Sequence, residues 1–269
     1  IDLLARWWKR MLAVIVLSLL AVGTITFLKP QKYLSVATAV PASSFASDRS
    51  KVFNENIQAL YSTLGTPDDL DMIVGTANLD TVYFAVAKQF NLYDHYKMKE
   101  EGDAAVEKAA SILMNNTRVM KSEYGELKVK VWDTDKNLAP QLANAIMDVL
   151  QAIHIGLQSA GNSSVLSGLI TGKKKLQLQI DSIAGTDDIA TEKRKKTIEQ
   201  LQQYDQLINE YQLMIDSKPP VLIEVEKAKA TDWVDKPKTK QILVATAFLS
   251  FLFSLLAALL MERRKTRYL

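Results

Sequence analysis

Two long uncharged apolar blocks stand out in the chain, one near each end. The first runs from Met11 to Leu28 and the second from Ile242 to Met261. At about 1.5 Å of rise per helical residue, each block crosses most of a hydrocarbon core of about 30 Å. The pattern therefore predicts two transmembrane helices, 11–28 and 242–261, separated by a mostly polar segment, 29–241.

The residues beside these blocks predict the orientation. Trp7 and Trp8 are aromatic residues of the kind that lie at membrane interfaces. Basic residues gather between each block and the nearer chain end: Arg6, Lys9, Arg10, Arg263, Arg264, Lys265 and Arg267. Three lysines before the second block reduce this contrast: Lys236, Lys238 and Lys240. We expect 1–10 and 262–269 to be cytoplasmic and 29–241 to be periplasmic. A cleaved signal peptide is the alternative for the first block, and its length favours an anchor.

Alternating apolar and polar positions predict three strands between the blocks. They cover Tyr33–Val40, Leu127–Trp132 and a segment that starts at Val221, with Ile223 and Val225 on its buried face. A loop is expected at 43–50. Because the first and last strands adjoin the two blocks, a sheet that contained both would lie next to the membrane.

Apolar residues spaced by three and four positions predict helices in the rest of the segment. One apolar face falls at 53–64, and a helix start is expected at Thr66–Asp69. Asn78 is expected to cap the next helix, and a further helix covers about Asp103–Met114.

A second helical region predicts a projecting arm, 138–217. Its periodicity begins at Leu138, is interrupted at Gly161–Ser164 and resumes over Val165–Ile183. After a turn at 185–188, the longest helix is expected at about Ile189–Ser217. The expected fold class is α+β: two transmembrane helices flank a periplasmic domain, which has a small mixed sheet at its membrane-proximal base and long projecting helices.

Composition excludes several functions. The net charge of +3 is too small to indicate a nucleic-acid partner, and the absence of cysteine excludes disulfides and thiolate chemistry. The two histidines, His95 and His154, have no partner at metal-ligand spacing, and neither a nucleophile elbow nor a phosphate-binding loop is present. We expect structural or exposed histidines, no cofactor, no metal and no enzymatic activity.

Two basic runs in the predicted arm, 173–175 and 193–196, are the charged candidates for a binding surface. Solvated helix surface is one interpretation of them. The other is contact with an anionic glycan or a neighbouring subunit, for which we select four residues: Lys174, Lys175, Arg194 and Lys195. If the two helices pack antiparallel, both runs lie near one end of the arm.

A heptad-like seam runs along the last predicted helix, through Leu201, Tyr204, Ile208, Tyr211 and Ile215. An intramolecular core is one interpretation of this spacing. An oligomer interface is the other, in which the two tyrosines present an apolar body and a polar hydroxyl to a second copy.

The order of these features resembles the polysaccharide co-polymerases, the chain-length determinant or Wzz-type family. The entry segment IDLLARWWKR, the strand KYLSVATAV, the middle run LKVKVWDTDKNLAPQLANAIMDVLQ and the return VEKAKATDWVDKPKTK are similar to corresponding parts of that family. Pro237 lies where the family's return carries a proline. The resemblance covers nearly the whole chain.

The resemblance implies a non-enzymatic protein of the bacterial inner membrane. Members assemble into homo-oligomeric rings and regulate the length, or assist the export, of a surface polysaccharide such as O-antigen, capsule or exopolysaccharide. The implied partners are a polysaccharide polymerase and the nascent polysaccharide. Ala37, in the small-residue strand, and Pro237 are expected to shape the membrane-proximal base.

Two other functions fit the same pattern. One is the ectodomain of a two-span receptor, and the other is an envelope scaffold or adaptor without a polysaccharide role. A receptor is expected to carry a cytoplasmic output domain, whereas only a short segment follows the second block.

Overall fold

The computed structural model describes residues 2–42, 69–183 and 188–266, which divide into two compact units. The first unit comprises the described chain up to Leu34, Trp132–Ala139 and everything from Ala230 onward. The second comprises the described parts of Ser35–Val131 and Pro140–Lys229. Some predicted features lie outside the described residues: the loop at 43–50, the apolar face at 53–64 and most of the turn at 185–188. Most of the helix start predicted at Thr66–Asp69 lies outside them as well.

Two apolar helices make up most of the first unit. Helix α1 spans Asp2–Leu28 and α10 spans Thr239–Thr266. Within them, Trp7–Leu28 and Thr239–Arg263 are long and apolar enough to cross a membrane. Only 11% of the apolar part of the first and 17% of that of the second are buried inside the structure. Phe27 is 89% exposed and Phe253 is 68% exposed. A core helix of a soluble protein would bury such side chains, so both helices fit the predicted membrane spans, and we refer to them as the two spans.

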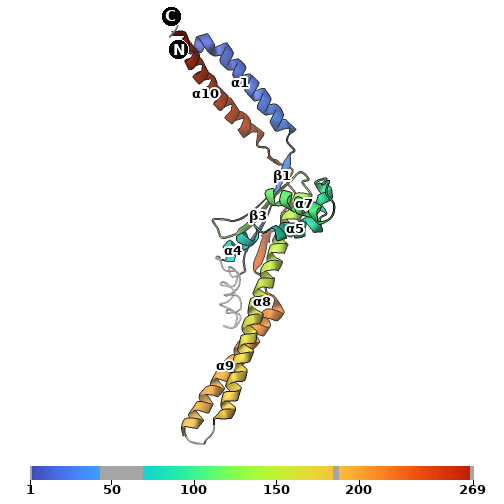
Figure 1. Ribbon diagram of the computed structural model, residues 1–269, viewed down its shortest axis with the longest axis vertical. Coiled ribbons are helices and arrows are strands. Elements are labelled where there is room, and N and C mark those ends of the chain that lie inside the picture. Colours follow the sequence, from blue (N-terminus) through green and yellow to red (C-terminus); the bar gives the residue numbers. More distant parts are fainter. Residues whose placement is uncertain (1, 43–68, 184–187, 267–269) are drawn as a thin grey trace. The chain divides into compact units, whose positions relative to one another are not determined.

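The two spans contact each other along their length, as Figure 1 shows. Trp7, Met11 and Ala258 form a small buried cluster, against which Leu255 packs. The Trp7 indole donates a hydrogen bond of 2.9 Å to Oε2 of Glu262. Small residues elsewhere on α10 allow this close approach, since Ser250 and Ser254 are buried and their hydroxyls bond to carbonyls of their own helix.

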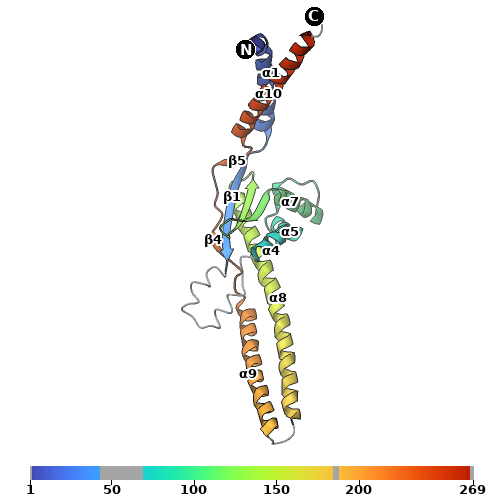
Figure 2. The same cartoon turned by 90° about the vertical axis from the view of Figure 1, so that its left-hand side faces the viewer.

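A small sheet forms the base of the fold, with strand order β2-β3-β1-β4. The strands are β1 (Lys32–Pro41), β2 (Thr117–Lys121), β3 (Leu127–Asp133) and β4 (Leu222–Glu226). Strand β1 pairs antiparallel with β4 and, at its other end, with the short β5, Val234–Lys236 (Figure 2). The strand that follows the first span thus pairs with the strand that precedes the second.

Four helices complete the base of the second unit before the arm. They are α4 (Asp69–Thr76), α5 (Asp80–Gln89), α6 (Leu92–His95) and α7 (Asp103–Asn115). Several of their side chains are fully buried, including Ile73, Val86 and Leu113, as are Leu127 and Val129 of β3. The period-two pattern predicted for β3 is confirmed, because buried and half-buried positions alternate over all of its residues.

The arm is an antiparallel helical hairpin. Helix α8 spans Leu138–Ser182 and α9 spans Asp188–Ser217, and both figures show them side by side. Three contacts between the helices fit a single antiparallel register along the hairpin. They join Asn162 to Met214, Lys173 to Asp205, and the carbonyl of Ile183 to Arg194. The fold class is therefore the predicted one, with two spans, a small sheet and long helices.

The predicted interruption at Gly161–Ser164 is wrong, because α8 runs through it for 45 residues and is the longest helix that the structure describes. Glycine and serine weaken a helix interior by about 1 kcal/mol or less each, which tertiary packing offsets. Here the Asn162 amide contacts the Met214 sulfur, and the Ser163 hydroxyl bonds to the Ser159 carbonyl at 2.8 Å. The long helix predicted at Ile189–Ser217 is confirmed as α9 but is second in length.

Two smaller predictions are also wrong. Asn78 does not cap α5; its side-chain amide donates to the Val74 carbonyl at the end of α4. Val225 does not lie on a buried face of β4 and is 57% exposed, because burial falls steadily along this strand from Leu222. A register irregularity between Thr38 and Ala39, in the partner strand β1, accompanies this loss of alternation.

Candidate functional site

The four basic residues selected in the arm lie in two different settings. Lys174, Lys175 and Lys195 are exposed, as expected of a contact surface. Arg194 is half-buried, and its Nη2 donates a hydrogen bond of 2.7 Å to the carbonyl oxygen of Ile183. Arg194 therefore joins α9 to the segment just after α8, a structural role that the sequence did not reveal.

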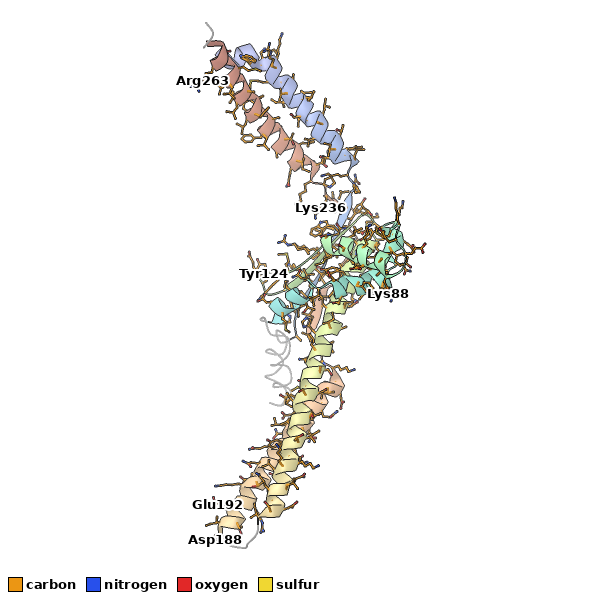
Figure 3. The ribbon with its side chains drawn as sticks, in the orientation of Figure 1. Lys88, Tyr124, Asp188, Glu192, Lys236 and Arg263 are labelled. Atoms are coloured by element: carbon orange, nitrogen blue, oxygen red, sulfur yellow. The ribbon has the colours of Figure 1, made fainter. Side chains whose placement is uncertain are left out.

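The hairpin register places both basic runs in the half of the arm that contains the turn, but at different positions along the hairpin axis. Lys173 forms an ion pair with Asp205, whereas Arg194 reaches the end of α8. The ten residues of α8 that separate these positions correspond to about 15 Å. Figure 3 shows Asp188 and Glu192 where α9 begins, so acidic side chains share the tip with the second run.

The seam of α9 faces α8 within the same chain. A Cβ atom added to Gly172 would lie 2.7 Å from Cε1 and 3.0 Å from the hydroxyl of Tyr204, so this ring packs directly on the glycine. Tyr211, two turns further along, is half-buried. Tyr204 thus contributes to the packing of the hairpin, and both rings remain partly exposed.

The two residues predicted to shape the base belong to different units. Ala37 is fully buried in β1, where a small side chain leaves room for the neighbouring strands and helices. Pro237 lies between β5 and α10, and its carbonyl accepts a hydrogen bond of 2.8 Å from the amide of Thr239, the first residue of α10. Pro237 therefore marks the change from strand to membrane span.

A cluster that sequence reasoning did not select surrounds Trp132 in the first unit. The Trp132 indole donates a hydrogen bond of 2.6 Å to Oδ2 of Asp235, and Nζ of Lys236 lies 3.6 Å from the centre of the indole ring. This is a cation–π contact at close range. Desolvation, followed by repulsion from Lys32 and Lys238, lowers the pKa of Lys236. The only sequence signal was the run of lysines before the second span.

A second polar link in the same unit joins Lys136 to Asp232, with Nζ 2.6 Å from Oδ1. Their mutual hydrogen bond raises the pKa of Lys136 and lowers that of Asp232. Both groups are exposed, so the pair contributes little to stability.

Buried polar groups elsewhere have structural explanations. His154 of α8 is 3% exposed, and its Nε2 lies 3.1 Å from the Thr76 hydroxyl of α4. This confirms the expectation of a structural histidine. Asp133 is 2% exposed and accepts a hydrogen bond from the amide of Asp135, which shapes the turn that leads into α8.

The chain is similar to several solved structures, among them the following two. A full-length bacterial polysaccharide co-polymerase is 15% identical, with a TM-score of 0.39, and the match covers 100% of this chain and 98% of that one. A fragment of WzzB from Salmonella Typhimurium is 17% identical, with a TM-score of 0.29, and the match covers 77% of this chain and 100% of the fragment. Both are polysaccharide co-polymerases. No family model and no curated protein matches the sequence. At such low identity and TM-score neither likeness bears on function, which we infer from this chain's own sequence and fold.

Proposed function

We propose that this protein is a polysaccharide co-polymerase of the bacterial inner membrane that assembles into a homo-oligomeric ring. In this role it regulates the chain length, or assists the export, of a surface polysaccharide that a separate polymerase makes. Both termini are cytoplasmic, and 29–241 is periplasmic. The protein performs no chemistry on the polymer.

The architecture is the observation that carries this proposal. Two membrane spans are joined to one sheet by strands β1 and β5, and a helical hairpin is inserted between β3 and β4. The four sequence segments that resemble the co-polymerase family, from the entry segment to the return before the second span, follow one another along the chain in the family's order. A receptor or adaptor would not require this combination.

The arm supplies the surfaces that the proposal needs. Lys174, Lys175 and Lys195 present exposed positive charge to an anionic glycan or to a neighbouring copy. Tyr204 buries one side of its ring against Gly172 of α8, Tyr211 is half-buried, and the exposed parts of both rings are available to a second copy.

The oligomeric mass and symmetry of the detergent-purified full-length protein test the proposal. Single-particle imaging is expected to show a closed ring of many copies. A strain that lacks the gene is then expected to make surface polysaccharide with an altered length distribution, which the wild-type gene restores. A monomer or dimer that persists across mild detergents would contradict the proposal and favour the receptor or adaptor functions.

A further inference from the structure

Three lysines of the first unit gather where the two membrane spans end. Lys32 follows α1 by four residues, and Lys236 and Lys238 immediately precede α10. Lys32 and Lys236 are strand partners in the β1–β5 pairing, so their Cα atoms lie opposite each other. Figure 3 shows Lys236 at this end of the spans and Arg263 at the other. We call Lys32, Lys236 and Lys238 the collar lysines.

The collar lysines repel one another. Like charges placed opposite each other on paired strands destabilise the pairing. Repulsion from Lys32 and Lys238 contributes to the lowered pKa of Lys236. Across the parts of the chain that the structure describes, Lys236 and Lys238 form no ion pair. The fold therefore concentrates positive charge at this level, and an anion placed there would relieve the repulsion.

Two acidic side chains lie in the same segment. The Asp235 carboxylate accepts the hydrogen bond from Trp132 and offsets part of the repulsion at Lys236, and Asp232 pairs with Lys136. The Trp132 ring also holds the Lys236 ammonium in place from one side. The indole of Trp233 is 84% exposed, and an exposed tryptophan beside a membrane span is typical of the headgroup level.

We propose that the collar lysines bind the phosphate of an anionic phospholipid headgroup in the outer leaflet, with the exposed indole of Trp233 inserted beside it. The position argues for a lipid occupant, because the lysines lie within four residues of the ends of the two spans, where headgroup phosphates are expected. The lipid anchors the strand pair β1–β5 to the membrane surface. The choice of the outer leaflet rests on the orientation given with the proposed function, whereas the binding itself is measured without polysaccharide and tests the site separately.

Contact between a labelled residue and a quencher lipid tests the site. The chain has no cysteine, so Ala230→Cys, at an exposed position of the same unit, takes one fluorophore specifically. The full-length protein is placed in phosphatidylcholine nanodiscs. One sample contains a trace of phosphatidylglycerol that carries a contact quencher near its headgroup, and a parallel sample contains the same amount of phosphatidylcholine with the same quencher. We expect stronger quenching by phosphatidylglycerol.

Three variants make the test specific. K32Q/K236Q/K238Q is expected to reduce the preference for phosphatidylglycerol by at least about tenfold, because each of the three lysines loses its attraction to an anionic surface. K32R/K236R/K238R keeps the charges and is expected to retain the preference, which separates charge from misfolding. K88Q/K193Q/K196Q removes the same number of charges from exposed lysines of the second unit and is expected to leave the preference unchanged.

Two results would overturn the proposal. One is an equal preference in the wild type and the glutamine variant. The other is loss of the wild-type preference when inorganic phosphate is added at constant ionic strength, which would identify a site for free phosphate instead of a lipid headgroup.

Discussion

Gly168 and Gly172 lie one helical turn apart in α8, yet their surroundings differ. A Cβ atom at Gly168 would meet nothing within 4 Å, whereas one at Gly172 would lie 2.7 Å from the Tyr204 ring. Gly168→Ala is expected to stabilise the arm by up to about 1 kcal/mol, because alanine favours the helix. Gly172→Ala is expected to destabilise it by about 1 kcal/mol, because the clash exceeds this gain.

Hydrogen exchange of the α8 and α9 amides in the full-length protein measures both effects locally. The double variant Gly172→Ala/Tyr204→Ala removes the ring and is expected to be less destabilised than the sum of its single changes. Equal protection in the Gly168 and Gly172 variants would show that Tyr204 does not pack on this glycine.

Tyr83 of α5 gives a pH-dependent prediction. Burial raises the pKa of Tyr83 from 10.0 to about 12. The folded protein therefore favours the neutral phenol, and this contribution is complete below pH 10 and is lost as the pH rises to 12. A shift of two units corresponds to about 2.7 kcal/mol at most.

The wild type and Tyr83→Phe are compared by thermal unfolding between neutral pH and pH 12. The wild type is expected to lose more stability over the alkaline part of this range, since phenylalanine cannot ionise. Parallel curves for the two proteins would contradict the assignment of the raised pKa to Tyr83.

At the scale of the elements, β1 depends on a row of small residues. Ala37 is fully buried, and Ala39 is as well, whereas Val36 on the other face is half-buried. Ala37→Leu is expected to destabilise the protein by about 1–3 kcal/mol through overpacking. Val36→Leu is the control and is expected to change stability by about 0.5 kcal/mol or less. Denaturant unfolding followed by circular dichroism measures both, and equal effects would show that β1 tolerates bulk on either face.

The elements that the sequence predicted well are those with strong periodicity. The sequence predicted the elements in which apolar residues recur regularly along one face or throughout: the two spans, β1, β3, α7 and α9. Strand β2 was missed, since TRVMK has few apolar residues and gains its pairing from β3 across a turn at Gly125, whose φ is 76°. The continuity of α8 was missed because contacts with α9 outweigh its weak local propensity.

The candidate site was harder to predict than the fold. The sequence identified Arg194 by its charge, but its bond to the Ile183 carbonyl depends on the hairpin register, which no local pattern encodes. Trp132 and Lys236 are far apart in sequence and meet only through the pairing of the strands around β1. Side-chain constellations of this kind follow from tertiary pairing and not from spacing.

At the scale of the whole molecule, the proposed role predicts that exposed charge on the arm affects polymer length. Lys174→Glu/Lys195→Glu is expected to shift the length distribution of the surface polysaccharide without unfolding the protein. These residues are preferable to Arg194, whose reversal would also remove the bond to Ile183.

Lys88→Glu, an exposed position of α5, is the single-charge control and is expected to leave the polymer profile unchanged. Gel electrophoresis of the polysaccharide from complemented deletion strains measures the profile. A wild-type profile in the double variant would exclude Lys174 and Lys195 as contacts.

The pairing of β1 with β5 has a consequence for how such chains diversify. Because Lys32 and Lys236 are strand partners, the segment that joins the two spans begins and ends with Cα atoms about 5 Å apart. Everything between these residues is a cassette whose two ends nearly touch. A change in the length of the arm leaves these two strand partners opposite each other, so the arm can lengthen or shorten while the entry to the second span stays beside the exit from the first.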